Sequence, residues 1–366
     1  MKVVQLLEDL EIQMGGRAEE KLEKKNFYIM SDEFYSKLKT LADYALGVEI
    51  PFLDIYNPYQ GQDLNNRKIL SIRHGGFGDI LFLLTGYSEL KRKYPQSSLN
   101  LAISPMYFPT IENNPNIDQV FSLPIKLDDW NEFHYHLIFE GLIENNPEAE
   151  VLNAYDLFMQ QMSLNIREVP PENKIPKLFF KDQEFIDIKK AYPQLISNKK
   201  KVGIQIASSS PIRNYPPHKF LPVIEYLISK DYEVYLFGSS NQSTPINYLG
   251  SQFKSNIYKI IGPLREALVM AKLMDYIIAC DSMFIHAAGA LRIPLIGLYG
   301  PFHSSLRMKY FMNAIGIDAR TACSPCFQHG HSPCSKGDPS PCMNLITSEM
   351  IIDSLNELEN KCEVVK

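Results

Sequence analysis

The sequence predicts an α/β protein with two doubly wound halves, each a parallel sheet covered by helices. Two observations support this class. From Lys68 onward, short apolar runs of strand length alternate with longer amphipathic runs, and the same rhythm starts again at Lys201. At 366 residues with 45% hydrophobic content, the chain is long enough to bury two domain cores.

The first 66 residues precede the alternating pattern, and we expect them to form a helical N-terminal extension. The segment 31–47 has a Ser31 cap, acidic residues in the first turn, apolar residues at helical spacing, and Gly47 as a stop. Residues 50–66 are rich in Pro, Asn and Gln, which is typical of a connector.

Residues 67–198 are expected to form the first doubly wound domain. The pattern predicts strands at 68–73, 99–104 and 120–124, with a helix over 80–95. Residues 150–198 are more helical and include the proline-rich segment VPPENKIP, which favours a passage between domains.

Residues 199–366 are expected to form the second domain. The predicted strands cover 201–207, 233–238, 276–281 and 294–300, and the predicted helices cover 217–229, 264–273 and 283–291. Strands and helices alternate here as well, which indicates βαβ units and a second parallel sheet.

Charge and hydropathy exclude several classes of protein. The net charge of −5 argues against a partner that is a nucleic acid or an anionic membrane, since both are held by excess Lys and Arg. The apolar N-terminal stretch is interrupted by acidic residues, and no run approaches 18 apolar residues, so we expect neither a signal peptide nor a transmembrane span. The expected location is the cytoplasm.

The loop HGGFGD, residues 74–79, lies between the first predicted strand and its helix, where such folds bind ligands. Gly76 and Gly78 allow a substrate to approach the backbone closely, and a helix N-terminus favours negative charge. The glycine spacing is neither that of a phosphate-binding Walker loop nor that of the dinucleotide fingerprint. Asp79 has two interpretations, a helix-capping carboxylate or a general base for a sugar hydroxyl, and one residue can be both.

In the second half, ASSSPIRNY follows the strand at 201–207. The hydroxyls of Ser208, Ser209 and Ser210 with the cation of Arg213 are suited to bind a diphosphate, while the alternative is an ordinary polar loop.

The strand at 276–281 ends in Asp281, and Ser282 opens the next helix. Backbone amides at that helix start make a second candidate anion site. His286, one turn further, is either a buried core histidine or a phosphate contact.

Four of the six cysteines, Cys323, Cys326, Cys334 and Cys342, fall in one Pro- and Gly-rich loop, residues 323–342. Four thiolates are enough for a closed tetrahedral structural site, with zinc or iron as the candidate metals, and free thiols are the alternative. Cys323, Cys326 and His331 also fit the start of a nucleic-acid zinc knuckle, but the loop lacks interleaved basic and aromatic residues. We therefore expect no nucleic-acid partner.

Together these motifs resemble glycosyltransferase family 9, the bacterial ADP-heptose transferases. The resemblance is carried by Gly78-Asp79, by Asp-Ser-x-x-x-His at 281–286, and by LIGLYGP, which precedes a Cys-rich loop; it covers roughly residues 67–350. It implies a GT-B fold, in which two Rossmann-like domains face a cleft and the C-terminal one holds the nucleotide sugar.

The resemblance also implies roles for particular residues. Asp79 matches the family's proposed base, Ser209 and Arg213 match its phosphate-contacting Thr and Lys, and Asp281, Ser282 and His286 match its donor-site motif. The implied reaction is an inverting transfer, most simply of heptose from ADP-heptose to a glycan or protein hydroxyl, without a catalytic metal. In some relatives that glycosylate autotransporter proteins a cysteine finger carries iron.

Three departures from the family pattern keep alternatives open. Met283 stands where the family usually has Gly, Arg213 replaces Lys, and 66 residues precede the first strand. The alternatives are a sugar-nucleotide-binding or metal-dependent scaffold protein that has lost turnover, and an NAD-type oxidoreductase, which the glycine spacing disfavours. For residues 1–66 we expect a role in acceptor choice or self-association, and the enzyme is expected in the cytoplasm or peripherally at the inner membrane.

Overall fold

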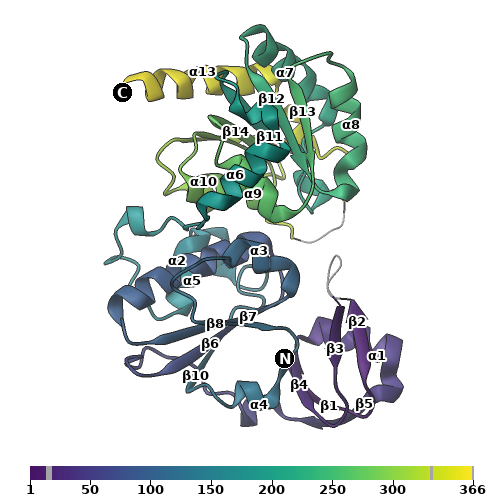
Figure 1. The fold of residues 1–366 in the computed structure, drawn as a ribbon, viewed down its shortest axis with the longest axis vertical. Helices are drawn as coiled ribbons and strands as arrows, with labels where there is room; N and C mark the ends of the chain where they lie inside the picture. The colour runs from purple at the N-terminus through teal and green to yellow at the C-terminus, as the bar shows by residue number, and fades with distance from the viewer. Residues whose placement is uncertain (14–18, 330–332, 365–366) are drawn as a thin grey trace. The chain divides into compact units, whose positions relative to one another are not determined.

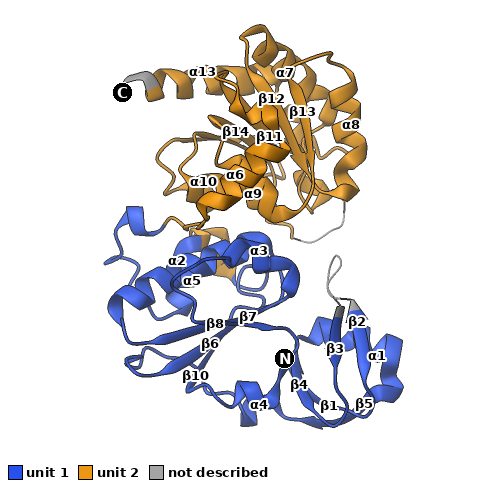
Figure 2. Cartoon of the chain, in the orientation of Figure 1, with its two compact units in different colours: residues 1–146, 155–174 blue, residues 147–154, 175–366 orange. Residues whose placement is uncertain are grey.

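The computed structural model describes residues 1–13, 19–329 and 333–364. By its internal contacts the chain divides into two compact units (Figures 1 and 2). Unit 1 comprises residues 1–146 and 155–174, and unit 2 comprises residues 147–154 and 175–366. His331, which the knuckle alternative used, lies outside the described residues.

Unit 1 contains a four-stranded parallel sheet in the order β10-β6-β7-β8. The predicted strands and the helix after the glycine loop are confirmed, while β10 was missed because its sequence, YHLI, is short and contains a histidine. The bounds are β6 Lys68–Arg73, α2 Phe77–Lys93, β7 Ser98–Ile103, β8 Gln119–Ser122 and β10 Tyr135–Ile138, with the short helices α3 Phe108–Ile111 and α4 Leu127–Trp130 and the longer α5 Ala154–Gln161.

The prediction that residues 1–66 are helical is wrong for most of that segment. One helix forms as expected, α1 at Asp32–Ala42, and the Ser31 hydroxyl accepts a hydrogen bond from the amide of Phe34. The rest is mainly strands: an antiparallel sheet in the order β5-β1-β4-β9 and a hairpin of β2 and β3. The bounds are β1 Lys2–Leu6, β2 Leu10–Gln13, β3 Glu19–Leu22, β4 Phe27–Met30, β5 Leu46–Ile50 and β9 Ile125–Lys126.

Burial explains the difference. The runs KVVQL and FYIM are β-branched or aromatic, and such residues favour a pleated surface that is buried on one side. Val3 and Ile29 pack in one apolar cluster with Leu70, Ile72 and Ala102 of the parallel sheet. The N-terminal strands therefore share a core with the first βα layer.

Unit 2 contains a six-stranded parallel sheet in the order β13-β12-β11-β14-β15-β16, so the strand order reverses between β11 and β14. In sheets of this kind ligands bind beyond the carboxyl ends of the strands at that reversal. The bounds are β11 Lys201–Gln205, β12 Glu233–Gly238, β13 Ile257–Ile261, β14 Tyr276–Cys280, β15 Leu295–Tyr299 and β16 Ala314–Asp318.

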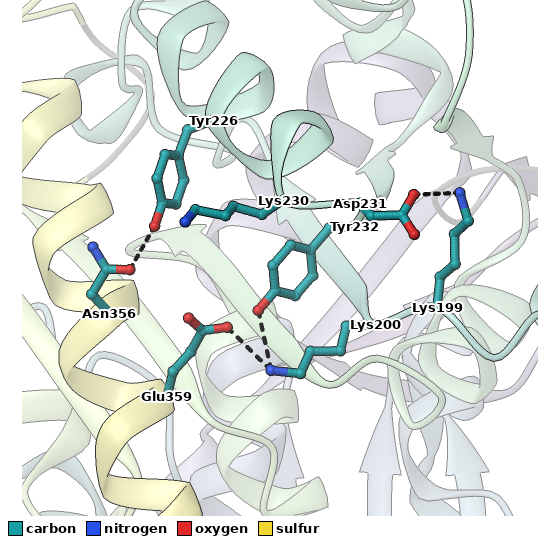
Figure 3. A pocket seen from close by; sticks show the side chains of 8 residues that line it. All are labelled: Lys199, Lys200, Tyr226, Lys230, Asp231, Tyr232, Asn356 and Glu359. Atoms are coloured by element: carbon teal, nitrogen blue, oxygen red, sulfur yellow. Dashed lines mark hydrogen bonds and ion pairs between the residues drawn. The ribbon is translucent and has the colours of Figure 1, made fainter.

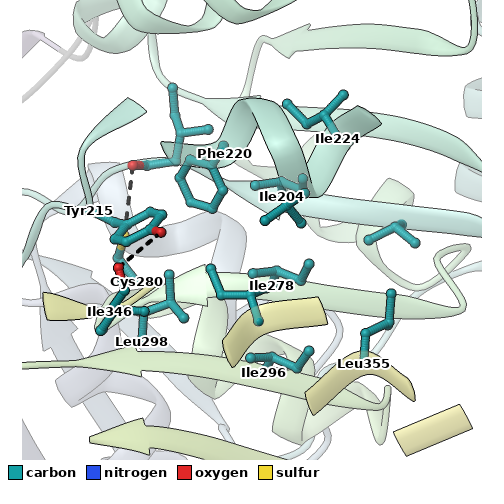
Figure 4. Close-up of a cluster of buried hydrophobic side chains, with 14 of the residues drawn as sticks. Ile204, Tyr215, Phe220, Ile224, Ile278, Cys280, Ile296, Leu298, Ile346 and Leu355 are labelled. Carbon is teal, nitrogen blue, oxygen red and sulfur yellow. Dashed lines mark hydrogen bonds between the residues drawn. The ribbon is translucent and has the colours of Figure 1, made fainter. Parts of the chain in front are cut away.

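Helices cover both faces of this sheet, which confirms the doubly wound class. On one face, α7, α8 and α13 pack over Ile204, Ile278 and Ile296 (Figure 4). On the other face, α6, α9 and α10 pack over Tyr235 and Ile277. The bounds are α6 Asp182–Ala191, α7 Phe220–Ser229, α8 Ser243–Ser251, α9 Leu264–Ala271, α10 Met283–Leu291, α11 Ser305–Met308, α12 Pro341–Leu345 and α13 Ser348–Val364.

Among the described residues, none of the helices combines the length and the apolar character that crossing a bilayer requires.

Candidate functional site

The glycine loop of unit 1 has the conformation that its sequence suggests. Gly76 has a φ of +83°, which favours glycine, and it is the N-cap residue of α2. Asp79 is the third residue of the helix and not its N-cap, and Gly78 is the second. A Cβ atom at Gly76 would lie 2.0 Å from Oδ2 of Asp79, so this glycine leaves room for the carboxylate.

Arg73, the last residue of β6, binds the Asp79 carboxylate. Its Nη2 lies 2.5 Å from Oδ2 of Asp79 and 2.9 Å from Oε1 of Glu144, while Nε and Nη1 donate to the carbonyls of Gly75 and Phe139. The Arg73 side chain is 4% exposed and that of Asp79 is 16% exposed. Burial alone would lower the pKa of Arg73, but the surrounding carboxylates raise it above its usual value, which keeps the guanidinium charged.

His74 connects the loop to the N-terminal strands and to a second carboxylate. Its Nδ1 lies 2.9 Å from Oε1 of Glu140, which also accepts the His74 amide at 2.5 Å. Its Nε2 accepts the amide of Ser31, the residue that caps α1, at 3.1 Å. Although burial raises the pKa of Glu140, its contacts with His74 and Arg73 lower it overall, which favours a carboxylate.

In unit 2, the loop after β11 divides the three predicted serines. Ser208 and Ser210 are buried, and their polar atoms bind within the loop: the Ser208 amide donates to Oδ1 of Asn214 at 2.7 Å, and its hydroxyl donates to the Ser210 carbonyl at 2.7 Å. Ser209 is exposed. Ser208 therefore shapes the loop, and Ser209 is the hydroxyl that a ligand can reach.

The helix α10 starts as the sequence predicts. Ser282 is its N-cap; the hydroxyl accepts the amide of Phe284 at 3.3 Å and donates to Oε1 of Gln205 at 3.0 Å. Met283, in place of the usual glycine, is the first helical residue.

Asp281 and Arg213 lie together beside this helix start. The Arg213 Nη1 atom is 3.5 Å from Oδ2 of Asp281, whose side chain is 3% exposed. Neither Nε of Arg213 nor Oδ2 of Asp281 has a hydrogen-bond partner among the described residues, although both atoms are buried. A buried donor of this kind usually has a partner. The arrangement therefore presents a cation with free hydrogen-bonding capacity next to a helix N-terminus.

His286 lies in the core of unit 2, and burial lowers its pKa to about 3. Asp281 acts in the opposite direction, whereas Arg307 and Arg213 lower the pKa further. His286 is thus a neutral imidazole close to Asp281, which belongs to the same sequence motif, and to Arg213 of the loop after β11.

The cysteine loop brings three of its thiols within electrostatic range of the fourth, Cys342. Burial raises the pKa of Cys342, and the neighbouring Cys326, Cys334 and Cys323 contribute in the same direction. All four are free cysteines. In the described part of the chain no three His, Cys, Asp or Glu side chains gather closely enough to hold a metal ion. Four thiolates nevertheless have the chemistry that zinc or iron prefers. The metal site therefore stays a prediction from the sequence.

A pocket of about 380 Å³ lies at the opposite edge of the unit 2 sheet, where β11 and β12 begin (Figure 3). Its charges are largely paired: Lys199 binds Asp231 at 2.6 Å and Lys200 binds Glu359 at 3.4 Å. Because ligands of doubly wound sheets bind at the carboxyl ends of the strands, this pocket is not the candidate site.

The sequence prediction missed four titratable residues of unit 1: Arg73, His74, Glu140 and Glu144. His74 is the first residue of the quoted loop and Arg73 directly precedes it, so their proximity to Asp79 was available as a signal. Glu140 and Glu144 follow β10, which was not predicted, and only the pairing of β10 with β6 brings them to Arg73.

Comparisons with known proteins agree with these motifs. The model of "Glycosyltransferase family 9 (heptosyltransferase)" matches residues 143–335. The lipopolysaccharide heptosyltransferase 1 of Campylobacter coli is 23% identical over 288 residues, which are 64% of this chain and 84% of that protein.

Solved structures show the same fold at low identity. E. coli ADP-heptose lps heptosyltransferase II superposes with a TM-score of 0.65 at 17% identity, over 81% of this chain and 99% of its own. The dodecameric iron-containing heptosyltransferase TibC of enterotoxigenic E. coli, in complex with ADP-D-beta-D-heptose, superposes with a TM-score of 0.58 at 15% identity, over 98% of this chain and 91% of its own. These similarities confirm the GT-B fold.

Proposed function

The chain belongs to glycosyltransferase family 9, and from this premise we propose that it transfers heptose from ADP-heptose to an acceptor hydroxyl with inversion at the anomeric carbon. Membership makes it a glycosyltransferase enzyme. The proposed donor is supported by the curated relatives, which are lipopolysaccharide heptosyltransferases, and by the TibC complex, which contains ADP-D-beta-D-heptose.

We assign the donor diphosphate to the loop after β11 and the start of α10. The observation that carries this assignment is the buried, unpartnered Nε of Arg213 beside Asp281. A guanidinium binds phosphate oxygens with two parallel hydrogen bonds, and the positive end of the helix dipole at the start of α10 favours the same negative charge. Ser209 adds a hydroxyl. Together these groups would stabilise the departing ADP without a catalytic metal.

Asp79 is the proposed general base. An inverting transfer needs a group that accepts the proton of the acceptor hydroxyl as it attacks the anomeric carbon. Asp79 is partly exposed, lies in the first turn of α2, and is held by the buried Arg73. A nearby cation favours the ionised carboxylate, which is the form that accepts a proton. Gly76 and Gly78 leave the space in which the sugars would approach it.

We also propose a structural zinc or iron at Cys323, Cys326, Cys334 and Cys342. The loop contains many Pro and Gly residues and little apolar material, so a metal would order it. TibC, whose fold matches nearly the whole chain, is iron-containing. The metal would hold the loop in place and would take no part in the transfer.

Self-association through the first 66 residues is a further part of the proposal. Among the described residues of this segment, five large apolar side chains are exposed: Leu7, Leu41, Tyr44, Val48 and Leu53. Exposed apolar groups of this kind are typical of contact surfaces, and TibC is dodecameric. Sedimentation of the wild type and of the Leu41→Ser plus Leu53→Ser variant tests this; equal sedimentation of the two would contradict it.

The proposed activity is tested by incubating the purified full chain with a panel of nucleotide sugars and of glycan and peptide acceptors. Mass spectrometry of the products should show transfer from ADP-heptose, and NMR should show inverted anomeric configuration. Binding of the donor without transfer or hydrolysis would favour the scaffold alternative, and no binding of any nucleotide sugar would contradict the proposal.

A further inference from the structure

The amino edge of the unit 2 sheet has a basic residue in front of every strand. Six connections, all described, lead from a helix into a strand at this edge: residues 192–200, 230–232, 252–256, 272–275, 292–294 and 309–313. Their basic residues are Lys199, Lys200, Lys230, Lys254, Lys272, Arg292 and Lys309, and their acidic residues are Asp231 and Asp275. Neighbouring strands of a sheet lie about 4.8 Å apart. Six parallel strands therefore place these cations along one edge that is about 24 Å long.

Most of this positive charge is not neutralised within the described part of the chain. Four of the cations are exposed and form no ion pair with a described carboxylate: Lys230, Lys254, Arg292 and Lys309. Of the two acidic residues, Asp231 is paired with Lys199 at 2.6 Å, and Asp275 accepts the backbone amide of Lys201 at 2.7 Å. The edge therefore presents several free ammonium and guanidinium groups to solvent.

The pocket at this edge shows how the free cations are placed (Figure 3). The ammonium of Lys230 lies 5.7 Å from the centre of the Tyr226 ring, and both residues line the pocket. The Tyr226 hydroxyl donates to Oδ1 of Asn356 at 2.6 Å, which leaves the Asn356 amide as a further donor at the same pocket. With a volume of about 380 Å³, the pocket has room for a phosphate group.

Two large aliphatic side chains stand on the same connections. Ile196 precedes β11 and is 66% exposed, and Met312 precedes β16 and is 84% exposed. Cations beside exposed aliphatic groups are typical of a surface that lies on an anionic membrane, where the apolar groups enter the boundary between headgroups and acyl chains. A nucleic acid offers stacked bases and phosphates, on which Ile196 and Met312 would gain little. The combination therefore favours a bilayer.

We infer that the amino edge of the unit 2 sheet is a docking face for an anionic phospholipid bilayer. The lysines and Arg292 bind lipid phosphates, and Ile196 and Met312 enter the headgroup boundary. The net charge of −5 does not oppose this docking, because charges farther away than about 8 Å are largely screened at physiological salt and the local charge decides. The candidate donor site lies at the opposite, carboxyl edge of the sheet, so docking leaves Arg213 accessible. Docking through this face depends on neither the proposed donor nor the proposed base.

The test is co-sedimentation of the full chain with two kinds of vesicle, phosphatidylcholine alone and phosphatidylcholine with an equal amount of phosphatidylglycerol. The wild type should bind the anionic vesicles at least about tenfold more tightly, and this preference should shrink as salt is raised. Equal binding to both kinds of vesicle, or binding to neither, would overturn the inference.

A charge variant makes the test specific to this edge. Lys254→Gln plus Lys309→Gln should weaken binding to the anionic vesicles at least about tenfold. The matched control is Lys24→Gln plus Lys93→Gln, two exposed lysines of unit 1. Lys93 lies over the ring of the tyrosine that follows it, as Lys309 does. An equal loss in the two double variants would show that overall charge, and not this edge, attracts the vesicles. Unchanged ADP affinity shows that the variants are folded.

An apolar variant separates a bilayer from other polyanions. Ile196→Ser plus Met312→Ser should weaken binding to the anionic vesicles and leave any binding to mixed-sequence duplex DNA unchanged. Wild-type vesicle binding in this variant, or binding of the wild type to DNA as tight as to the anionic vesicles, would contradict a bilayer as the partner. Failure of the proposed function is seen separately, as absence of ADP binding or of transfer from ADP-heptose in solution.

Discussion

The guanidinium of Arg73 lies 2.5 Å from the carboxylate of Asp79, across a loop in which Gly76 has a left-handed backbone. The two residues are six positions apart, at the end of β6 and in the first turn of α2. The parallel strand β10 then adds Glu144 to the same guanidinium. The strand end, the glycine turn and the helix start thus hold one partly exposed carboxylate in a defined position.

Removing the Arg73 charge should affect both folding and the pH dependence of transfer. In Arg73→Met three carboxylates lose their buried counter-charge, and breaking a buried ion pair costs about 3–5 kcal/mol. The acidic limb of the kcat/KM profile should move to higher pH, because the cation no longer favours the ionised base. Arg73→Lys keeps the charge and should shift the limb less. An unchanged profile in a folded Arg73→Met protein would contradict the role assigned to the pair.

Arg213 should contribute to donor affinity and, through its ion pair with the buried Asp281, also to the fold. Arg213→Met should raise the dissociation constant of ADP by about 10- to 100-fold, since hydrogen bonds to charged groups contribute about 1.5–3 kcal/mol. Arg213→Lys should retain part of the affinity. The control is Arg167→Met, an exposed arginine of unit 1. Calorimetry with ADP alone measures the effect, and equal affinities for all variants would show that the diphosphate lies elsewhere.

The buried His286 predicts a loss of stability in acid. Burial lowers its folded-state pKa from 6.5 to about 3, so between these values the unfolded chain binds a proton that the folded chain does not. Stability therefore falls as the pH drops below 6.5, by about 2 kcal/mol between pH 7 and pH 5 for this group. Denaturant unfolding at pH 7 and pH 5 should show that His286→Gln loses less free energy of unfolding than the wild type. The exposed His218→Gln should lose as much as the wild type. If the free energy of unfolding of His286→Gln fell with pH as steeply as that of the wild type, His286 would not be the group responsible.

The cysteine loop should bind about one equivalent of metal. Elemental analysis of protein made without affinity-tag histidines should find that metal in the wild type and in Cys362→Ser, whose cysteine lies in α13, and almost none in Cys323→Ser plus Cys326→Ser. If the wild type contained no metal and were as stable as the double variant, the proposal of a structural metal would be wrong.

Local sequence patterns predicted much of this structure. Each predicted strand of unit 2 and the capped starts of α1 and α10 were found because periodicity and capping residues act over a few positions. The strands of the first 66 residues were not, since their stability comes from a core shared with Leu70 and Ile72, distant in sequence.

The candidate site shows the same difference between local patterns, which the sequence reveals, and contacts between distant residues, which it does not. Asp79, Arg213 and Ser282 follow predicted strands and were singled out from position alone. The ion pair of Arg73 with Glu144 joins residues 71 positions apart, and it depends on the pairing of β10 with β6. The exposure of Ser209 between two buried serines depends on side-chain contacts with Asn214, which no spacing rule predicts.

The central claim is that Asp79 takes the proton from the acceptor while unit 2 holds the donor. The most direct measurement is the transfer rate of Asp79→Asn with ADP-heptose and the best acceptor of the panel, alongside the dissociation constant of ADP. We predict a rate at least about 100-fold below wild type, the usual scale for a lost general base, with ADP affinity nearly unchanged. A near-normal rate in this variant would contradict the account and leave Asp79 as a first-turn residue that only stabilises α2.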